Sequence, residues 1–442
     1  MAQSDPGIQE VLGKLAAEDA AVAQAAGVAL SWVTAGGGTA RITQERVQRF
    51  LWYDLPLKVG ADTPTRQALA NALGQALDLL GLPRYADICR SSTTAGVLAA
   101  YEDNPQRGLA AFRQANLASG IYPLDLPEFR WGATMGLEEA RALSAVQDYL
   151  ELAVAAGELV PGARGWKSKQ ARLVRSFINA PSFQLGGQTP LSVTLTERIQ
   201  TWIGIEPSPT RRRLLSGLAN RLLHSIELPP GTFDPYPPLS WLLGHMAEGI
   251  RLTDKRKLDP AFLEEAAPRF GWELSTPPAE EEQLTDLHIL RRMTQTLRLA
   301  RRSGKQLMLT RKGRALLEDP LTTWRMVPEA FLSGNTFSRL AGELFFAQLI
   351  DEESLPLDQV VSTIGQAVEE ANYREAGTGL PPARESILRA LQATLNQARA
   401  LGLFAASPSY EERRVGLTPV GKATALQALR SWATAPGSVP LR

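Results

Sequence analysis

The sequence predicts a mainly α-helical protein: a helical N-terminal domain followed by two units, each with a helix, a short β-hairpin and a second helix. Three observations lead to this prediction. Apolar residues recur at helical spacing through the N-terminal half, as at Leu69, Leu73 and Leu77. The alternation of apolar and polar residues that marks strands is scarce there. In the C-terminal half a Leu-Thr dipeptide recurs, and two of its copies are followed by a nearby glycine.

The composition is that of a globular protein with several domains. The chain has 442 residues, of which 44% are hydrophobic and 21% are charged, as in chains that fold around a core. Lys and Arg number 47 against 46 Asp and Glu, so any excess of positive charge must be local. The single Cys89 excludes a disulfide framework. No segment has the pattern of a signal peptide or a membrane span, and we therefore expect a cytoplasmic protein without membrane contact.

Residues 1–185 are expected to form one helical domain or two. An Ala-rich helix is predicted over 1–34, interrupted at Gly27, and an amphipathic helix is predicted over 64–82. Further helices are expected over 92–102, 105–119, 135–156 and 167–178.

Residues 186–240 are punctuated by proline and are expected to form a helical connector. Within it, Arg211-Arg212-Arg213 opens a helix expected over 210–223. Three cations at the positive end of a helix dipole are explained either by solvation or by an anionic partner.

A basic stretch with one tryptophan follows a predicted glycine-rich turn in the N-terminal half. Its candidate nucleic-acid contacts are Arg164, Trp166, Lys167, Lys169 and Arg172. Cations of this kind can hold phosphates while the indole stacks on a base. Asp and Glu are absent from Leu159 to Gly187. A helix whose basic face is only solvated explains the same pattern, so both interpretations stay open.

The Leu-Thr signature is explained by the requirements of a helix start. Thr310 and Thr418 are preferred N-cap residues, whose hydroxyl accepts a hydrogen bond from a free helical N–H. Gly313 and Gly421 would let another element pack closely on the first turn. The elements expected in the two units are helices over 284–300 and 383–401, a turn over 301–305, and strands over 306–309, 403–404 and 413–417. The units themselves are expected to span 241–330 and 331–435.

This order of elements resembles the winged-helix fold. The segment LGLFAASPSYEERRVGLTPVGKA (401–423) is similar to the wing of MarR-type regulators, which share a Gly-apolar strand, a hairpin with acidic residues and two arginines, and the LTxxG signature. The signatures over 251–324 also resemble those of bacterial proteins related to plasmid pRiA4b ORF-3. The resemblance covers mainly residues 250–435, and it implies a helix in the DNA major groove and a wing on the backbone. It departs at the first Leu-Thr, where Arg256 replaces the glycine, so that copy is either a different element or the strand that opens the unit.

The first of the two units carries the strongest basic feature of the chain. Between residues 287 and 317 there are nine Lys or Arg and no Asp or Glu. The candidate phosphate contacts are Arg291, Arg292, Arg298, Arg301, Arg302, Lys305, Arg311, Lys312 and Arg314. A solvated or protein-facing surface is the alternative explanation. The second unit mixes both signs of charge, which suits protein contact or dimerisation through 331–435 better than phosphate.

No catalytic or metal-binding pattern accompanies these units. None of His224, His245 and His288 has a second histidine three or four residues away. The carboxylates occur in contiguous runs, whose side chains point in different directions, and no phosphate-binding Walker loop is present. We therefore expect a non-enzymatic, regulatory DNA-binding protein without a cofactor or metal. A protein-interaction scaffold and an enzyme with an active site gathered from distant segments are the alternatives.

Overall fold

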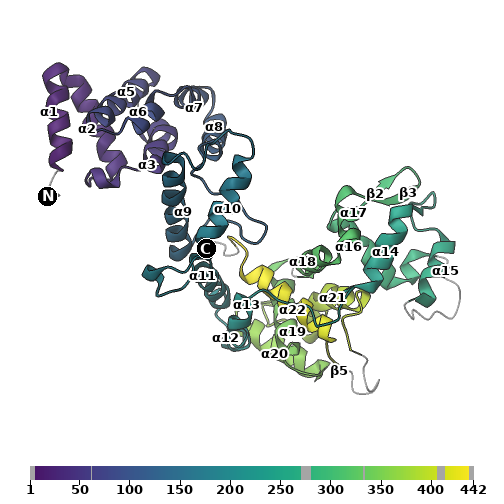
Figure 1. The fold of residues 1–442 in the computed structure, drawn as a ribbon. Coiled ribbons are helices and arrows are strands. Elements are labelled where there is room, and N and C mark those ends of the chain that lie inside the picture. The colour runs from purple at the N-terminus through teal and green to yellow at the C-terminus, as the bar shows by residue number, and fades with distance from the viewer. Residues whose placement is uncertain (1–4, 61, 270–279, 332–333, 406–413, 438–442) are drawn as a thin grey trace. The chain divides into compact units, whose positions relative to one another are not determined.

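The computed structural model describes residues 5–60, 62–269, 280–331, 334–405 and 414–437. They form a mainly helical protein with only short antiparallel strand pairs (Figure 1), and the predicted fold class is confirmed. The chain divides into two compact units, Met1–Thr194 (unit 1) and Leu195–Arg442 (unit 2). The finer boundaries at 185, 240 and 330 stay predictions. Among the described residues no helix is both long and apolar enough to cross a membrane.

The regular structure of unit 1 in its described part is helical, apart from one isolated bridge between Leu126 and Phe129. Its α-helices are α1 (Pro6–Glu18), α2 (Ala20–Thr34), α3 (Gln44–Arg49), α4 (Leu55–Lys58), α5 (Thr63–Leu79), α6 (Pro83–Arg90), α7 (Ser92–Asp103), α8 (Pro105–Ala118), α9 (Leu137–Ala155) and α10 (Trp166–Asn179). A π-helical turn, Phe50–Asp54, joins α3 to α4. The next helix, α11 (Pro190–Gly204), runs from unit 1 into unit 2.

The predicted helix over 1–34 is two helices, and the break is not at Gly27. Asp19 ends α1 in an extended conformation, and its carboxylate accepts hydrogen bonds from Ala21 N and Val22 N at the start of α2. An N-cap aspartate stabilises a new helix start, whereas a single helical glycine costs only about 1 kcal/mol relative to alanine. Gly27 therefore stays inside α2, and the chain turns at Asp19.

The core of unit 1 gathers α1, α2, α5, the π-helical turn and α7 around buried residues such as Leu30, Phe50 and Leu73. The buried carboxylate of Glu151 links α9 to this core by hydrogen bonds. Glu151 accepts a 2.9 Å hydrogen bond from Gln44 N at the start of α3, and it also accepts from the Tyr85 hydroxyl of α6. These bonds fix the walls of a cleft between α3 and α9 that is described below.

Unit 2 consists of α11 and of the elements α12 (Pro209–Ser216), α13 (Ala219–Leu223), α14 (Pro237–Glu248), β1 (Ile250–Arg251), α15 (Pro260–Arg269), α16 (Thr285–Thr296), β2 (Ala300–Ser303), β3 (Gln306–Leu309), α17 (Arg311–Glu318), α18 (Pro320–Phe331), α19 (Thr336–Leu349), β4 (Leu355–Pro356), α20 (Leu357–Glu370), α21 (Arg384–Ala400), β5 (Arg414–Val415) and α22 (Pro419–Ala433). One continuous core of buried residues runs from Ile199 to Ala433. Both predicted units are thus built on a single core.

The order helix, strand, two helices, hairpin, helix occurs twice in unit 2. The first repeat runs from α14 to α17, and its strands form a sheet in the order β1-β3-β2. The second repeat runs from α19 to α22, where β4 pairs with β5 and Phe404 pairs with Leu417. The tip of the second hairpin, including the predicted loop over 407–412, lies outside the described residues.

Both repeats end with the same three features around the threonine and the glycine of the LTxxG signature. Thr310 and Thr418 cap α17 and α22, each accepting from the glycine N–H three residues later at 3.1 and 3.0 Å. The backbone N–H of each threonine donates to the carbonyl of the residue that starts the hairpin, Leu299 or Leu403. A Cβ on Gly313 would overlap the Leu299 oxygen, and a Cβ on Gly421 would overlap the Leu403 oxygen in the same way. The predicted threonine caps are confirmed.

Two local predictions for the first repeat need correction, and one open alternative is decided by the structure. The helix predicted over 284–300 ends at Thr296, because Leu299 N returns to Thr294 O and Arg298 adopts a left-handed conformation. Arg301 and Arg302 lie on β2 rather than in a turn, which instead centres on Gly304 with φ 60°. The first Leu-Thr copy is the strand that opens the unit, since Ile250 and Arg251 pair with β3.

Candidate nucleic-acid interface

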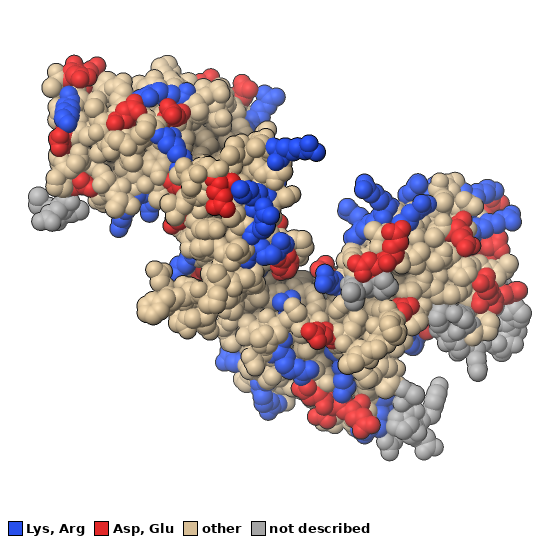
Figure 2. Space-filling view, in the orientation of Figure 1, with Lys and Arg blue, Asp and Glu red and all other residues tan. Residues whose placement is uncertain are grey.

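The nine predicted phosphate contacts of the first repeat lie on consecutive elements. Figure 2 shows Lys and Arg side chains gathered over the part of unit 2 where Figure 1 labels β2, β3 and α17. Arg291 and Arg292 lie on α16, Arg298 follows it, Arg301 and Arg302 lie on β2, Lys305 lies in the hairpin turn, and Arg311, Lys312 and Arg314 lie on α17. All of them except Arg291 are exposed.

Six of these exposed side chains form no ion pair within the part of the chain that the structure describes. They are Arg292, Arg298, Arg301, Arg302, Arg311 and Arg314. Guanidinium groups without a carboxylate partner keep all their N–H donors available to an incoming anion. Their mutual repulsion is modest in water because salt screens exposed charges. The arrangement therefore leaves a positive surface that an anionic partner would neutralise.

The two lysines of this surface, Lys305 and Lys312, each form one contact within the chain. Lys305 Nζ lies 2.7 Å from Asp254 Oδ1, but the two side chains are 77% and 88% exposed, and such a surface pair contributes only about 0–1 kcal/mol. Lys312 Nζ donates to the Leu297 carbonyl at 3.2 Å, which ties the start of α17 to the end of α16. Both ammonium groups remain at the surface.

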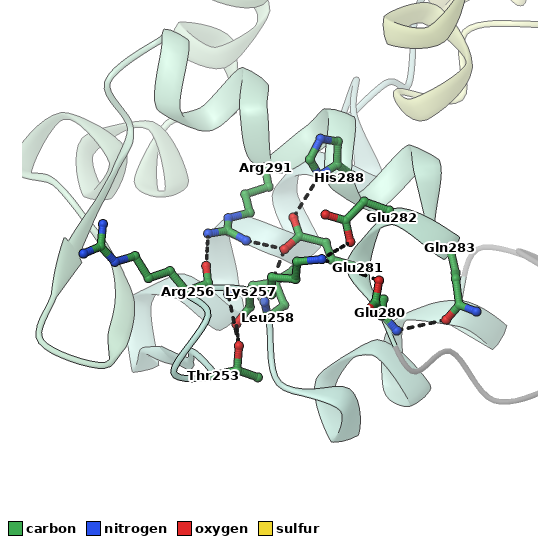
Figure 3. A network of polar contacts seen from close by, with 10 residues as sticks. All are labelled: Thr253, Arg256, Lys257, Leu258, Glu280, Glu281, Glu282, Gln283, His288 and Arg291. Atoms are coloured by element: carbon green, nitrogen blue, oxygen red, sulfur yellow. Dashed lines mark hydrogen bonds and ion pairs between the residues drawn. The ribbon is translucent and has the colours of Figure 1, made fainter.

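Arg291 is the exception among the nine, because its side chain is turned into a buried polar network (Figure 3). Its side chain is only 14% exposed and is paired with Glu281, which is 2% exposed. A second guanidinium nitrogen donates to the Arg256 carbonyl at 2.8 Å. Two of its guanidinium nitrogens are therefore engaged inside the protein, while Nε is buried without a partner. Arg291 lines the same cleft as Arg256, but it has fewer free donors for a phosphate than its exposed neighbours. Arg291 is a positioning residue for the loop that contains Arg256.

Glu281 is the centre of that network. Its carboxylate accepts from Leu258 N at 3.2 Å and lies 3.3 Å from His288 Nδ1, so His288 also points inward to it (Figure 3). At the edge, Lys257 Nζ binds Glu282 at 2.9 Å, and Glu280 N donates to Gln283 Oε1 at 2.9 Å. These bonds hold the segment around Glu281 and the loop over 253–258 against α16.

Sequence reasoning missed Arg256 as a candidate site residue. The exposed Arg256 side chain lines a cleft of about 250 Å³ together with Arg301, Arg302 and Gln295, over a floor that includes Leu252. Its backbone has φ 63° and presents the carbonyl that Arg291 holds. The basic pair Lys255-Arg256 was the available signal, but the sequence could not show that this loop lies beside β2.

Arg298 occupies a backbone position that glycine normally fills. Its φ of 58° is left-handed, and the equivalent residue of the second repeat is Gly402 with φ 72°. A non-glycine residue in this region costs of order 1–3 kcal/mol and is found preferentially at functional sites. An arginine retained there is consistent with a role for its exposed guanidinium.

In the basic stretch of unit 1, Arg164, Lys167 and Arg172 are exposed, while Trp166 and Lys169 are half-buried. Trp166 starts α10 after Gly165, and the Lys167 ammonium lies 5.9 Å from the centre of its indole ring. Among the described residues no ion pair engages the cations of this predicted site, which are Arg164, Lys167, Lys169 and Arg172. The neighbouring Arg175 pairs with Glu128 at 2.5 Å. The nucleic-acid contact of this stretch stays a prediction.

Three arginines of the second repeat are engaged within the chain. Arg399 on α21 pairs with Asp286 on α16 at 2.8 Å and so links the two repeats. Arg384 pairs with Asp358, and Arg414 donates to the Ser354 hydroxyl and carbonyl at 2.9 and 2.7 Å. These arginines contribute to packing and leave fewer donors for phosphate than those of the first repeat.

Comparison with known proteins finds a similarity in unit 2. Residues 242–322 match the model of the family described as the Y4jL N-terminal domain. This range contains α16, the β2–β3 hairpin, α17 and all nine basic residues of the predicted site. No curated protein and no solved structure matches the chain. The match covers most of the first repeat.

Proposed function

We propose that the first repeat of unit 2 binds duplex DNA through its phosphate backbone, as part of a regulatory, non-enzymatic protein of the cytoplasm. The observation that carries this proposal is the group of six exposed arginines without ion pairs on α16, the hairpin and α17. Phosphate contacts supply most of the affinity of such proteins. No acidic residue within 287–317 offsets the charge of this segment.

The arrangement supports a winged-helix mode of binding. In that mode a helix enters the major groove while the wing touches the adjacent backbone. By order along the chain, α16 takes the place of the recognition helix and β2–β3 that of the wing. Arg292 is the exposed arginine of α16, and Arg301 and Arg302 belong to the wing. The cleft lined by Arg256 and the two wing arginines then accepts a phosphate group.

A salt titration of DNA binding tests this proposal. The double variant Arg301→Ala/Arg302→Ala is expected to bind a mixed-sequence duplex more weakly. The slope of log K against log salt should fall by about one for each phosphate that the variant no longer neutralises. The matched control, Arg384→Ala/Arg389→Ala on α21, removes the same charge from the second repeat and should change both quantities much less. The proposal fails if the intact protein has no affinity for duplex DNA at low salt, or if both double variants weaken binding equally.

The second repeat is the better candidate for protein contact. Several of its arginines are engaged within the chain, as in the pairs of Arg399 with Asp286 and Arg384 with Asp358, so packing rather than phosphate binding explains these side chains. Dimerisation through 331–435 is tested by sedimentation equilibrium of the full chain. A concentration-dependent dimer that persists after nuclease treatment supports it, and a monomer at all concentrations overturns it.

A further inference from the structure

Unit 1 contains a cleft that the proposed DNA binding does not use. Its volume is about 690 Å³, which lies within the range of about 300–1,000 Å³ that small-molecule sites occupy. Its walls come from α3, the π-helical turn, α8, the segment after α8, and α9. The side chains that matter below are Arg41, Glu45, Arg49, Tyr53, Phe112 and Asp148.

Glu45 is the unusual group in this cleft. It lies in the first turn of α3, and no hydrogen bond or ion pair engages its carboxylate among the described residues. Burial raises the pKa of Glu45, and Asp148 and Asp54 add to this effect, although Arg49 and Arg46 oppose it. A partly desolvated carboxylate without a hydrogen-bond donor is costly for a folded protein. A ligand that brings N–H donors would satisfy it.

An aromatic wall stands beside this carboxylate. The rings of Tyr53 and Phe112 are 5.4 Å apart and inclined by 42°, and Tyr122 also lines the cleft. Tyr53 belongs to the π-helical turn Phe50–Asp54, and such turns occur frequently at functional sites. Flat aromatic surfaces of this kind bind planar rings by stacking.

Arginines supply a third kind of contact. Arg41 and Arg49 line the cleft and are exposed. No ion pair engages Arg41 among the described residues, and Arg49 Nε lies 3.6 Å from Asp54 Oδ2. Arg46 donates to the Val33 carbonyl at 3.4 Å. The two outer guanidiniums are therefore placed to receive an anionic group.

Together these features restrict the chemistry of the ligand. A simple cation is disfavoured by the three arginines, and a simple anion is disfavoured by Glu45 and Asp148. An apolar ligand would leave the carboxylates and amides of the lining without partners. A molecule with a planar ring, N–H donors on that ring and an anionic end satisfies all three walls.

We propose that this cleft binds a guanine nucleotide, with the imino and amino groups of the base toward Glu45, the ring against Tyr53, and the phosphate toward Arg41 and Arg49. Two adjacent N–H donors match the two oxygens of one carboxylate. Adenine lacks this donor pair and cannot satisfy the carboxylate in the same way. The ligand is a free nucleotide, and its site is independent of the arginines in unit 2.

Isothermal titration calorimetry of the full chain with GMP, AMP and guanosine tests the assignment. GMP is expected to bind more tightly than AMP by about tenfold, since the carboxylate forms charge-assisted hydrogen bonds only with guanine. Guanosine, which lacks the phosphate, should also bind more weakly than GMP. Equal affinities for GMP and AMP, no detectable binding of GMP, or tighter binding of putrescine than of GMP overturns the proposal.

Variants separate this site from the rest of the protein. Glu45→Gln should lower GMP affinity by about tenfold, and Arg41→Gln, at an exposed position, should lower it without any effect on folding. Glu158→Gln removes an exposed carboxylate of unit 1 and should leave affinity unchanged. Arg301→Ala/Arg302→Ala should also leave GMP binding unchanged, whatever it does to DNA binding. If that double variant abolishes GMP binding, or if Glu45→Gln and Arg41→Gln both bind GMP normally, the cleft is not the site.

Discussion

Arg298 and Gly402 occupy the same backbone position in the two repeats of unit 2. Each follows a helix C-cap, and their φ angles are 58° and 72°. In each case the next residue, Leu299 or Leu403, donates its N–H to a carbonyl of the preceding helix, at 2.7 and 2.9 Å. One repeat thus has the residue that this geometry prefers, and the other has an arginine in its place.

Replacement at these two positions should have opposite effects on stability. Arg298→Gly removes the left-handed strain and should stabilise unit 2 by about 1 kcal/mol, while Gly402→Arg should destabilise it by a similar amount. Urea denaturation of the full chain measures both. Arg298→Gly should in addition weaken DNA binding, because it removes an exposed guanidinium. A loss of stability in Arg298→Gly would show that the arginine supports the fold rather than a ligand.

A buried ion pair joins α12 to α19, and removing one of its two charges should strongly destabilise unit 2. Arg211 Nη2 lies 2.9 Å from Glu343 Oε2, and the side chains are 1% and 4% exposed. Arg211 also donates to the carbonyls of Trp202 and Ile203, each at 2.9 Å. Glu343→Gln leaves the guanidinium charge buried without a counter-ion, and we expect a loss of about 3–5 kcal/mol.

The exposed pair of Arg221 with Asp351 provides the matched control for this experiment. Asp351→Asn removes the same charge at the surface and should change the unfolding free energy by less than about 1 kcal/mol. Equal losses in the two variants would contradict the importance assigned to burial.

Cys89 should report the unfolding of unit 1. Its thiol is buried on α6, and burial raises its pKa to about 12, so almost no thiolate is present near neutral pH. We expect a thiol reagent such as DTNB to react with the native protein very slowly at pH 8 and with the urea-unfolded chain rapidly. Because the chain has one cysteine, the signal belongs to unit 1 alone. Rapid labelling of the native protein would mean that α6 opens readily.

Glu45 should make a contribution to the stability of unit 1 that falls as pH rises above the acid range. The pKa of Glu45 is near 4.5 in a solvated chain and is raised in the folded protein by burial. The folded state therefore holds this proton more tightly, and its contribution is fully present below pH 4.5 and is lost as pH rises through the folded pKa. The charges facing Glu45 are Arg46, Arg49, Asp54 and Asp148. Thermal unfolding as a function of pH measures the slope.

Two substitutions distinguish the source of this slope. Glu45→Gln should reduce it, and it should also stabilise the protein at neutral pH, where the carboxylate is otherwise charged and partly buried. Glu158→Gln should leave the slope unchanged. A slope that persists in Glu45→Gln would assign the pH dependence to another group, such as Asp148, whose pKa is also raised by burial.

The sequence predicted the features that depend on neighbouring residues. The threonine caps at Thr310 and Thr418 follow from the chemistry of a helix start, and the exposed basic residues near β2 follow from local charge. The sequence did not predict where charged residues would be buried. Arg211 belongs to a run of three arginines that suggested solvation or an anionic partner, and it is instead paired with a residue 132 positions away.

For the same reason, the sequence could not predict the burial of Arg291 or the cleft around Glu45. Arg291 differs from its neighbours only because Glu281 approaches from outside the basic segment, and that interaction depends on the folded loop over 253–258. The cleft around Glu45 brings together α3, α8 and α9, which are separated by long stretches of chain. Single residues of this cleft carry no distinctive pattern, so nothing in the sequence marks it.

The closure of each repeat has a consequence for how the protein can change. The bonds from Thr310 N to the Leu299 carbonyl and from Thr418 N to the Leu403 carbonyl involve only backbone atoms, beside a glycine that admits the close approach. None of them uses a side chain of the basic surface. Charged side chains of one repeat can therefore be replaced without breaking the backbone hydrogen bonds that close it. The shared core, to which the other repeat also contributes, is not affected by such replacements. In unit 2 the backbone bonds that close a repeat are thus separate from most of the charges proposed to bind DNA, and Arg298 is an exception because its left-handed backbone directly precedes Leu299.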